Sequence, residues 1–311
     1  MTLRQMTLVL LAMCAVTTPC RAELVADGIH LLPGRFVRGS QPDGNTVIIE
    51  APDGLIVVDT GRHPAHAQAI LDFASRARRP VAVIVNTHWH LDHLGGNPRV
   101  RRAHPGVRVW SSDALAGAMT GFLADYRAHL EGALAQAGLD TSSAATMRAE
   151  LAILDQGEAL APDEIVAAPG ARTIAGRELV LGLETRAVTA GDVWLFDPAT
   201  RVLIAGDLVT LPVPLPDTAC TSRWRSALDR LDEVDFSRLV PGHGPVMTRE
   251  DFARYRAAFG NLLDRAAADS SSTACADGWL HDIGPLVPAD EHAFARILLH
   301  YYVDNHLRPA R

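Results

Sequence analysis

The stretch NTHWHLDHLGGN, residues 86–97, decides the fold, because it places three histidines and one aspartate within six positions. Imidazole and carboxylate groups are good ligands for zinc and iron, and such crowding is improbable in an apolar core. His88 and His90 alternate around a tryptophan, so in an extended segment both face one way. Asp92 and His93 then fall on the turn into a helix and face a second position. The stretch therefore predicts a metal site in a loop between a strand and a helix.

The sequence around this stretch predicts two β-sheets with helices outside them. The β-branched runs NTVIIE and GLIVVDTG are separated by the turn signal APDG, a pattern that is typical of a hairpin. The apolar run PVAVIVN leads directly into the histidines and is typical of a strand that is covered on both faces. Residues 111–165 are alanine-rich and predict a helical insertion, after which strand-like segments resume and residues 291–307 predict a closing helix. This order of elements indicates an α/β architecture.

Composition and the N-terminal residues limit the class of protein. The net charge of −7 with histidines neutral argues against a nucleic acid or an anionic membrane as partner. Residues 1–22 have the plan of a secretory signal peptide, with an arginine, an apolar run and small residues that end at Ala22. The apolar run is too short to span a bilayer. We therefore expect a secreted or periplasmic protein that keeps no stable membrane anchor after signal cleavage.

Export also decides how the four cysteines are interpreted. Cys14 and Cys20 would leave with the signal peptide, whereas Cys220 and Cys275 would remain. An even pair of cysteines in an oxidising compartment predicts a disulfide bond between them, and two free buried thiols are the alternative.

Four motifs, taken in order, resemble the metallo-β-lactamase superfamily. The first is the histidine cluster itself, His-x-His-x-Asp-His. IAGDLV resembles the strand that ends in a metal-bridging carboxylate, which gives Asp207, and VPGHGPV resembles the last ligand motif, which gives His243. VVDTG resembles an earlier turn whose aspartate, Asp59, would orient a ligand. The resemblance implies zinc, as one or two ions, with iron and manganese as alternatives. The implied metal ligands are His88, His90, Asp92, His93, Asp207 and His243.

The resemblance also implies the fold, an αββα sandwich with a helical insertion and a C-terminal helical tail. Residues 23–262 would form the metallo-β-lactamase-like domain, and residues 263–311 a C-terminal helical extension. In this fold the proline-rich residues 211–220 would lie at the mouth of the pocket. Tyr301 and Tyr302 in the tail are expected to serve only helix packing.

One position departs from the family pattern. Where the family has a histidine in a Gly-His-Thr-x-Gly context, this chain has TRAVTAGD, with Val188 in place of the histidine. Because valine cannot ligate a metal, His88 and His90 keep only the shared Asp207 as a partner. Three interpretations follow. The site uses a single ion, held by Asp92, His93, Asp207 and His243. Alternatively it holds two ions, with water, Glu184, His129 or His281 filling the gap. In the third, the chain keeps the fold without catalysis.

The implied function is that of an exported metal-dependent hydrolase acting on a small ester, thioester, lactone or amide. Metal-activated water would be the nucleophile. Asp92 would orient or deprotonate that water, as would His88 and His90 if they hold no ion. Within the superfamily, the sequence most resembles the glyoxalase II-like hydrolases and the periplasmic hydrolases associated with quinoproteins and sulfur oxidation. A periplasmic β-lactamase and a non-catalytic accessory protein are the alternatives.

Overall fold

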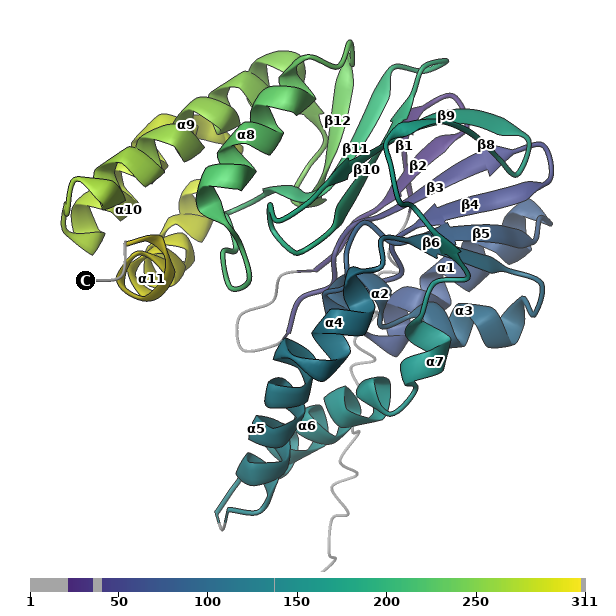
Figure 1. The fold of residues 1–311 in the computed structure, drawn as a ribbon, viewed down its shortest axis with the longest axis horizontal. Coiled ribbons are helices and arrows are strands. Elements are labelled where there is room, and N and C mark those ends of the chain that lie inside the picture. Colours follow the sequence, from purple (N-terminus) through teal and green to yellow (C-terminus); the bar gives the residue numbers. More distant parts are fainter. Residues whose placement is uncertain (1–21, 36–40, 137, 309–311) are drawn as a thin grey trace, which may run out of the picture.

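The computed structural model describes residues 22–35, 41–136 and 138–308. Within these residues two β-sheets pack face to face, and helices cover both outer faces (Figure 1). This is the αββα sandwich that the sequence predicts. The predicted signal peptide lies outside the described residues except for its last position. No helix in the described ranges is both long and apolar enough to cross a membrane.

The first sheet has seven strands in the order β1-β2-β3-β4-β5-β6-β7. The strands from β1 to β4 are antiparallel, and β4 to β7 run parallel to one another. The predicted hairpin is confirmed as β3 and β4, in which Val47 pairs with Val58. The strand bounds are β1 Glu23–Ala26, β2 Ile29–Leu32, β3 Thr46–Ala51, β4 Gly54–Val58, β5 Val81–Val85, β6 Arg108–Ser111 and β7 Glu164–Ile165.

The second sheet has six strands in the order β13-β12-β11-β10-β9-β8, and only β11 and β12 are parallel neighbours. Every residue of β11 is buried, because the strand is central in its sheet and covered on both faces. The strand bounds are β8 Gly170–Ile174, β9 Arg177–Glu184, β10 Asp192–Asp197, β11 Val202–Thr210, β12 Arg238–His243 and β13 Met247–Thr248.

Three apolar layers hold the sandwich together. Between the sheets, Ile49 and Val58 pack with Leu181 and Val193. Outside the first sheet lie α1 (Pro64–Ala77) and α3 (Asn97–Ala103), which contribute Ile70 and Val100 to a second apolar cluster. Outside the second sheet lie α8, α9, α10 and α11, and their cluster contains the largest fully buried side chains. The bounds of these helices are α8 Thr221–Asp232, α9 Arg249–Ala267, α10 Ser272–Ile283 and α11 His292–Tyr302.

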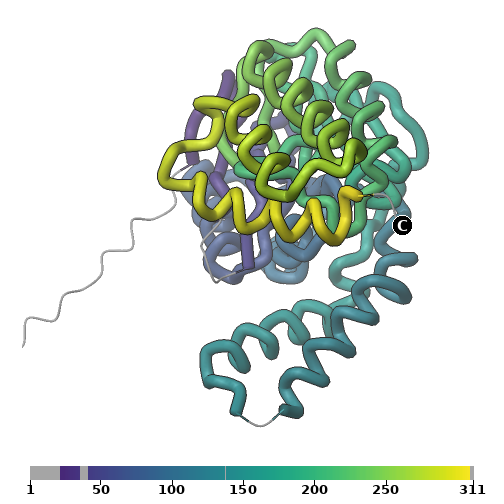
Figure 2. Tube along the Cα trace, turned by 90° about the vertical axis from the view of Figure 1, so that its left-hand side faces the viewer, coloured from purple at the N-terminus to yellow at the C-terminus, as the bar shows by residue number. Residues whose placement is uncertain are grey.

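Four helices between β6 and β7 form a helical arm, residues 114–160, that projects away from the two sheets (Figure 2). The arm occupies the predicted helical insertion. Its helices are α4 Ala114–Thr120, α5 Phe122–Leu134, α6 Thr141–Leu154 and α7 Gly157–Leu160. A small apolar cluster at its base joins Leu115 and Leu123 of the arm to Trp89 and Leu91 beside the histidines.

The predicted disulfide bond is wrong, because Cys220 and Cys275 are both free. Cys220 precedes α8 and its Sγ lies 3.7 Å from Ser222 Oγ. Cys275 is buried inside α10, where its Sγ lies 3.9 Å from the carbonyl oxygen of Ser270. One thiol thus lies just before α8 and the other within α10, and each has its own neighbours.

Candidate metal centre

The predicted ligands come from the segment that follows β5 and from the neighbouring strands β11 and β12. His88 and His90 lie in the loop that follows β5, and α2 (Leu91–Leu94) carries Asp92 and His93. Asp207 lies within β11, and His243 is the last residue of the parallel neighbour β12, so the sheet register brings them together. The structure therefore brings all six predicted residues to one place, although their role as ligands stays a prediction.

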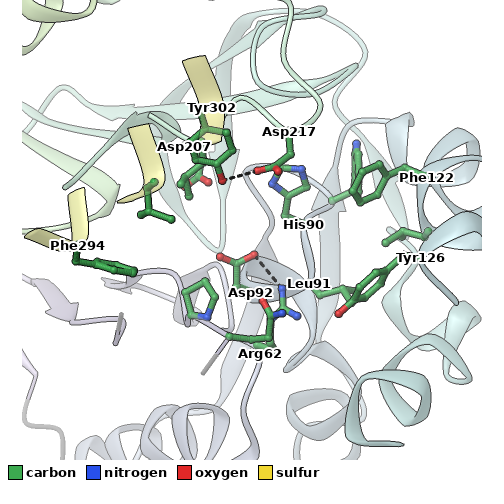
Figure 3. A pocket seen from close by; sticks show the side chains of 16 residues that line it. Arg62, His90, Leu91, Asp92, Phe122, Tyr126, Asp207, Asp217, Phe294 and Tyr302 are labelled. Carbon is green, nitrogen blue, oxygen red and sulfur yellow. Dashed lines mark hydrogen bonds and ion pairs between the residues drawn. The ribbon is translucent and has the colours of Figure 1, made fainter. Parts of the chain in front are cut away.

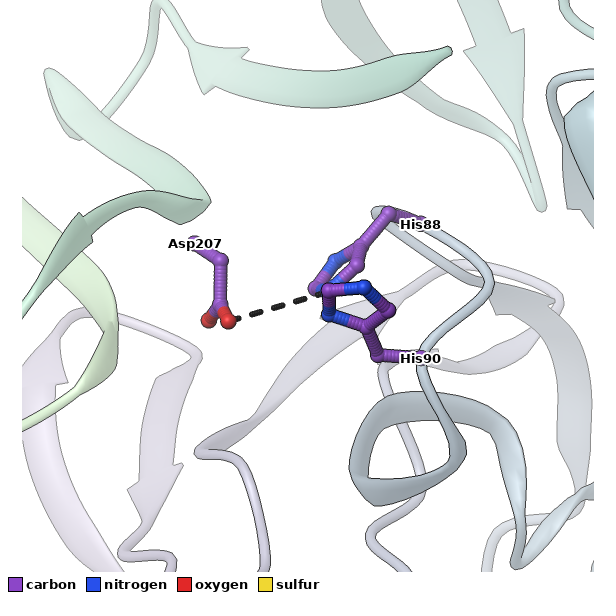
Figure 4. Close-up of side chains that lie close together, drawn as sticks. All are labelled: His88, His90 and Asp207. Atoms are coloured by element: carbon purple, nitrogen blue, oxygen red, sulfur yellow. Dashed lines mark ion pairs between the residues drawn. The ribbon is translucent and has the colours of Figure 1, made fainter. Parts of the chain in front are cut away.

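The six side chains form two groups with metal-binding geometry. His88, His90 and Asp207 form one (Figure 4), and Asp92, His93 and His243 form the other, with the ligand atoms of each group all within 4.8 Å of one another. The Asp207 carboxylate faces both groups, because Oδ2 lies 3.7 Å from His88 Nε2 and Oδ1 lies 3.1 Å from His93 Nε2. Asp207 thus occupies the position of a bridging ligand.

Buried polar atoms without hydrogen bonds show that this donor set fits a divalent cation. His88 Nε2 and both carboxylate oxygens of Asp207 are buried, and within the described residues none of them makes a hydrogen bond. Such orphaned atoms are costly, so proteins rarely keep them without a function. Histidine nitrogens and carboxylate oxygens are also the donors that zinc prefers. A bound divalent ion would satisfy all of these atoms.

The electrostatics of the cluster agree with a cation site. Burial lowers the pKa of both His88 and His90, so both imidazoles are neutral and keep a lone pair. Burial also acts to lower the pKa of His93, but neighbouring carboxylates, Asp207 foremost, outweigh it and raise that pKa well above the usual range. Burial acts to raise the pKa of Asp207, but the neighbouring imidazoles of His93, His243 and His88 together outweigh it, so the pKa of that carboxyl lies below its usual range. The buried carboxylates thus favour a positive charge at the position that a metal ion would occupy.

Two hydroxyl groups select which nitrogen of each histidine is available. Thr87 Oγ1 donates its proton to Asp59 Oδ2 (2.8 Å), so His88 Nδ1, 2.9 Å away, must be the donor to that hydroxyl. Thr218 Oγ1 donates to the Val188 carbonyl oxygen (2.9 Å), so His90 Nε2 donates to Thr218 at 3.0 Å. The available lone pairs are therefore on His88 Nε2 and His90 Nδ1.

Asp59 orients His93, as the resemblance implies. Its Oδ2 accepts from His93 Nδ1 at 2.8 Å, and its Oδ1 accepts from the Thr87 N–H at 2.8 Å. Asp59 sits at a positive φ of 61°, a conformation that asparagine also tolerates.

Replacing Asp59 with asparagine is expected to weaken zinc binding about 10–100-fold, the usual cost of losing a residue that supports a metal ligand. The fold should survive, because asparagine keeps the shape and accepts the same backbone angle. Competition with a chromophoric chelator measures the affinity. The matched control is Asp125→Asn, an exposed carboxylate on α5. Equal affinities for the two variants would show that Asp59 does not support the metal.

Two glycines let the backbone come close to the ligands. A Cβ added at Gly44 would lie 2.4 Å from the His93 ring, and one added at Gly242 would lie 2.0 Å from Asp207 Oδ1. Any side chain at either position would displace a predicted ligand, which explains the glycine before His243 in the PGHG motif.

The two groups form part of the floor of a cavity of about 450 Å³ (Figure 3). The polar residues that line it are Gln41, Arg62, His90, Asp92, Tyr126, Asp207, Asp217 and Tyr302. Its walls are apolar and come from the loop after β5, the helical arm, the proline-rich loop and α11. These wall residues include Trp89, Phe122, Leu123, Leu215, Phe294 and Leu298. The expectation that residues 211–220 lie at the pocket is confirmed by Leu215 and Asp217.

Buried ion pairs connect the helical arm to the cavity floor. Arg62 forms an ion pair with Glu150 of α6, and its other terminal nitrogen lies 3.6 Å from Asp92 Oδ1. The side chains of Arg62 and Glu150 are 10% and 5% exposed, so this pairing is shielded from solvent. Tyr126 of α5 adds a hydroxyl at 3.4 Å from Glu150 Oε2.

The position of the missing histidine is apolar and closed. Val188 is fully buried in the core on the α8 side, and its N–H donates to Asp192 Oδ2 at 3.0 Å. Among the described residues, none of the three proposed substitutes belongs to either group of possible metal ligands. Glu184 instead accepts from Arg230 Nε at 3.1 Å, and His281 lines a separate cavity beside α9. The interpretation in which one of these side chains fills the gap is therefore wrong.

The sequence argument missed Asp217, Thr218 and Tyr302. Tyr302 was expected to serve only helix packing, but its hydroxyl donates to Asp217 Oδ2 at 2.9 Å inside the cavity. The one available signal was the position of Asp217 in the proline-rich stretch that follows Asp207.

Comparison with known proteins gives three findings. A family model described as the metallo-beta-lactamase superfamily matches residues 40–243. A linear primary-alkylsulfatase from a Pseudomonas species is 27% identical over 224 residues, which is 65% of this chain and 42% of the relative. A hydroxyacylglutathione hydrolase from Gloeobacter violaceus is 38% identical over 72 residues, covering 23% of this chain and 27% of that protein. The chain thus spans less than half the length of these relatives.

Among solved structures, a metallo-beta-lactamase from Pontibacter korlensis superimposes with a TM-score of 0.57 at 22% identity. The match covers 78% of this chain and 99% of that one. At this level of identity the likeness concerns the fold.

Proposed function

The chain belongs to the metallo-beta-lactamase superfamily, and on that premise we propose that it is a metal-dependent hydrolase of small molecules. The observation that carries the proposal is the Asp207 carboxylate, buried without hydrogen bonds between two groups of histidine and aspartate ligands. This arrangement supports a divalent ion, zinc foremost, at the floor of the cavity.

Each group of residues has a part in this proposal. Asp92, His93, His243 and Asp207 would hold one ion, and His88 and His90 would bind with Asp207 on the other side. A bound divalent ion lowers the pKa of its water to about 7 and polarises the bond to be cleaved. Asp92 lines the cavity and is itself held by Arg62, so it is placed to orient the attacking water. If no ion sits beside His88 and His90, their neutral imidazoles are available to accept the proton of the water.

The cavity walls support a substrate that has an apolar group next to the bond to be cleaved. Aromatic and aliphatic side chains from the arm and from α11 face each other across the space above the ligands. An ester, thioester, lactone or amide with an acyl or alkyl chain would bury that chain here. The named activity of the alkylsulfatase relative, on a linear alkyl compound, agrees with such a pocket. A β-lactam is the alternative substrate class.

The setting of the enzyme belongs to the same proposal. We infer export to the periplasm or beyond from the signal-like pattern of residues 1–22. The net charge of −7 supports a small-molecule substrate rather than a nucleic acid.

Removing metal is expected to abolish hydrolysis, because the water then loses the ion that activates it. The protein is treated with a chelator, dialysed, and assayed on panels of thioesters, lactones, alkyl esters, alkyl sulfates and β-lactams. Zinc should restore the activity, and lengthening the acyl or alkyl chain should raise kcat/KM up to about 10-fold per methylene. Protein without bound metal and without turnover on any panel would instead favour the non-catalytic accessory protein.

A further inference from the structure

A second cavity, of about 470 Å³, lies between the helical arm and the two helices outside the first sheet. Residues of α1, α3 and α6 line it. Among the described residues, Arg62 is the single one that lines both this cavity and the first, and none of the predicted metal ligands lines the second. The proposed hydrolysis therefore gives this second cavity no task.

One wall of the second cavity is an apolar face of α6. It consists of Ala145, Ala149, Ala152 and Ile153, which are spaced along the chain as residues on one side of a helix. Three of these four side chains are single methyl groups, so they leave room for a ligand. Ligand-binding cavities are typically of this size and mostly apolar, with a few polar groups that fix the orientation of the ligand.

The opposite wall carries two arginines without a counter-charge. Arg99 and Arg102 lie three residues apart on α3, so they are on the same face of that helix, and both line the cavity. Within the described residues neither forms an ion pair. Their hydrogen-bond partners are neutral amide oxygens, of Gln68 on α1 for Arg99 and of Gln156 in the arm for Arg102 (2.9 Å). Arg101 on the same helix, by contrast, pairs with a carboxylate, that of Asp163, at 3.0 Å.

The other charges at the cavity are already balanced. Among the described residues that line it, Glu150 is the single carboxylate, and it forms the buried ion pair with Arg62. The Nδ1 atom of His63 lies 2.9 Å from Asp43 Oδ2, so the charge of a protonated His63 is balanced as well. The unbalanced charge is therefore positive, in a chain whose net charge is −7.

We infer that the second cavity is a binding site for a small organic anion with an aliphatic chain. Arginine guanidinium groups hold carboxylates by charge-assisted hydrogen bonds, so Arg99 and Arg102 would bind the charged end. The chain would lie along the apolar face of α6. This inference does not depend on the proposed hydrolysis, because no predicted metal ligand takes part.

The test is calorimetric titration of the full-length protein with octanoate, at concentrations where octanoate is monomeric. Octanamide has a chain of the same length without the charge, and acetate has the charge without the chain. We expect saturable binding of octanoate with a Kd of about 1 mM or tighter. Octanamide and acetate should each bind at least about 10-fold more weakly, because each lacks one of the two interactions.

Substitutions show which cavity the octanoate occupies. The double variant Arg99→Gln, Arg102→Gln is expected to bind octanoate about 10–100-fold more weakly, the effect of losing hydrogen bonds to charged groups. Arg148→Gln is the matched control, because Arg148 is exposed on α6 and does not line the cavity. Phe122→Ala should also leave the affinity unchanged, because Phe122 lines the first cavity and not the second.

Each other result counts against a specific statement. Octanoate binding that weakens in Phe122→Ala and not in the arginine variant places the anion in the first cavity, which overturns the inference and leaves the hydrolase proposal intact. Absence of saturable binding to wild type, or equal affinity for octanoate and octanamide, also overturns it. Failure of the hydrolysis assays would leave the expected octanoate binding unchanged.

A further variant decides the matter if the double arginine variant loses its circular dichroism spectrum. Ala149→Glu adds a carboxylate to the cavity wall at an exposed helix position, where glutamate is a good helix former. We expect this carboxylate to repel octanoate and to occupy the arginines, so that the affinity falls at least about 10-fold. An unchanged octanoate affinity in Ala149→Glu refutes the inference.

Discussion

Replacing Asp207 with asparagine is expected to remove most of the bound zinc and to lower kcat/KM by well over about 100-fold. The loss should exceed the 10–100-fold cost of removing a supporting residue, because Asp207 faces both ligand groups. Its oxygens lie 3.7 Å from His88 Nε2 and 3.1 Å from His93 Nε2, so no other side chain can substitute for it at both. Asparagine keeps the shape of this buried position, but it removes the charge and replaces one of the two acceptor oxygens with an NH2 donor.

Zinc content and thermal unfolding measure this effect together. A metal that binds only the folded protein raises Tm, so zinc should raise the Tm of wild type and leave that of Asp207→Asn nearly unchanged. Asp125→Asn is again the control. If Asp207→Asn kept the zinc content and the zinc-induced rise in Tm of wild type, the bridging position of Asp207 would have no consequence for binding.

Replacing Trp279 with alanine is expected to lower the free energy of unfolding by about 3–5 kcal/mol, the usual cost of deleting a large buried aromatic side chain. Trp279 is fully buried, its ring lies 5.8 Å from that of Tyr255, and its Nε1 donates to the Pro212 carbonyl oxygen at 2.9 Å. The substitution thus leaves a cavity and an unpaired carbonyl at the start of the proline-rich loop.

Urea denaturation of the metal-free protein measures this loss without a contribution from bound zinc. Trp279→Phe is the comparison, because it keeps most of the apolar volume and loses only the hydrogen bond; we expect it to cost about 1–3 kcal/mol. A loss below about 1 kcal/mol for Trp279→Ala would mean that α10 is not part of the cooperative core.

Features of this protein that depend on residues close together in the sequence could be predicted, whereas features that depend on distant residues could not. His88, His90, Asp92 and His93 lie in one short motif, and the two sheets follow from local runs of β-branched residues, so both could be inferred from the sequence. Asp207 and His243 were identified because their motifs resemble those of the family; local sequence patterns alone would not have placed them near the histidines.

Contacts that join distant segments could not be inferred. Thr218 meets His90 across 128 positions, and Tyr302 meets Asp217 across 85, with no local pattern to announce either contact. The disulfide prediction failed for the same reason, since an even number of cysteines says nothing of the distance between Cys220 and Cys275. The missing histidine at Val188 was visible in the sequence, whereas the hydrogen bond from Thr218 to the Val188 carbonyl oxygen was not.

Because Arg62 and Glu150 form a buried ion pair, the helical arm and residue 62 depend on each other and are expected to change together in evolution. A chain that lost the arm would lose Glu150, and the Arg62 guanidinium would be left with Asp92 as its ion-pair partner. Breaking a buried ion pair by removing one partner is destabilising, so we expect deletion of the arm to lower stability unless residue 62 is changed with it. Anyone who shortens or exchanges the arm to redesign the pocket should therefore change both positions in one step.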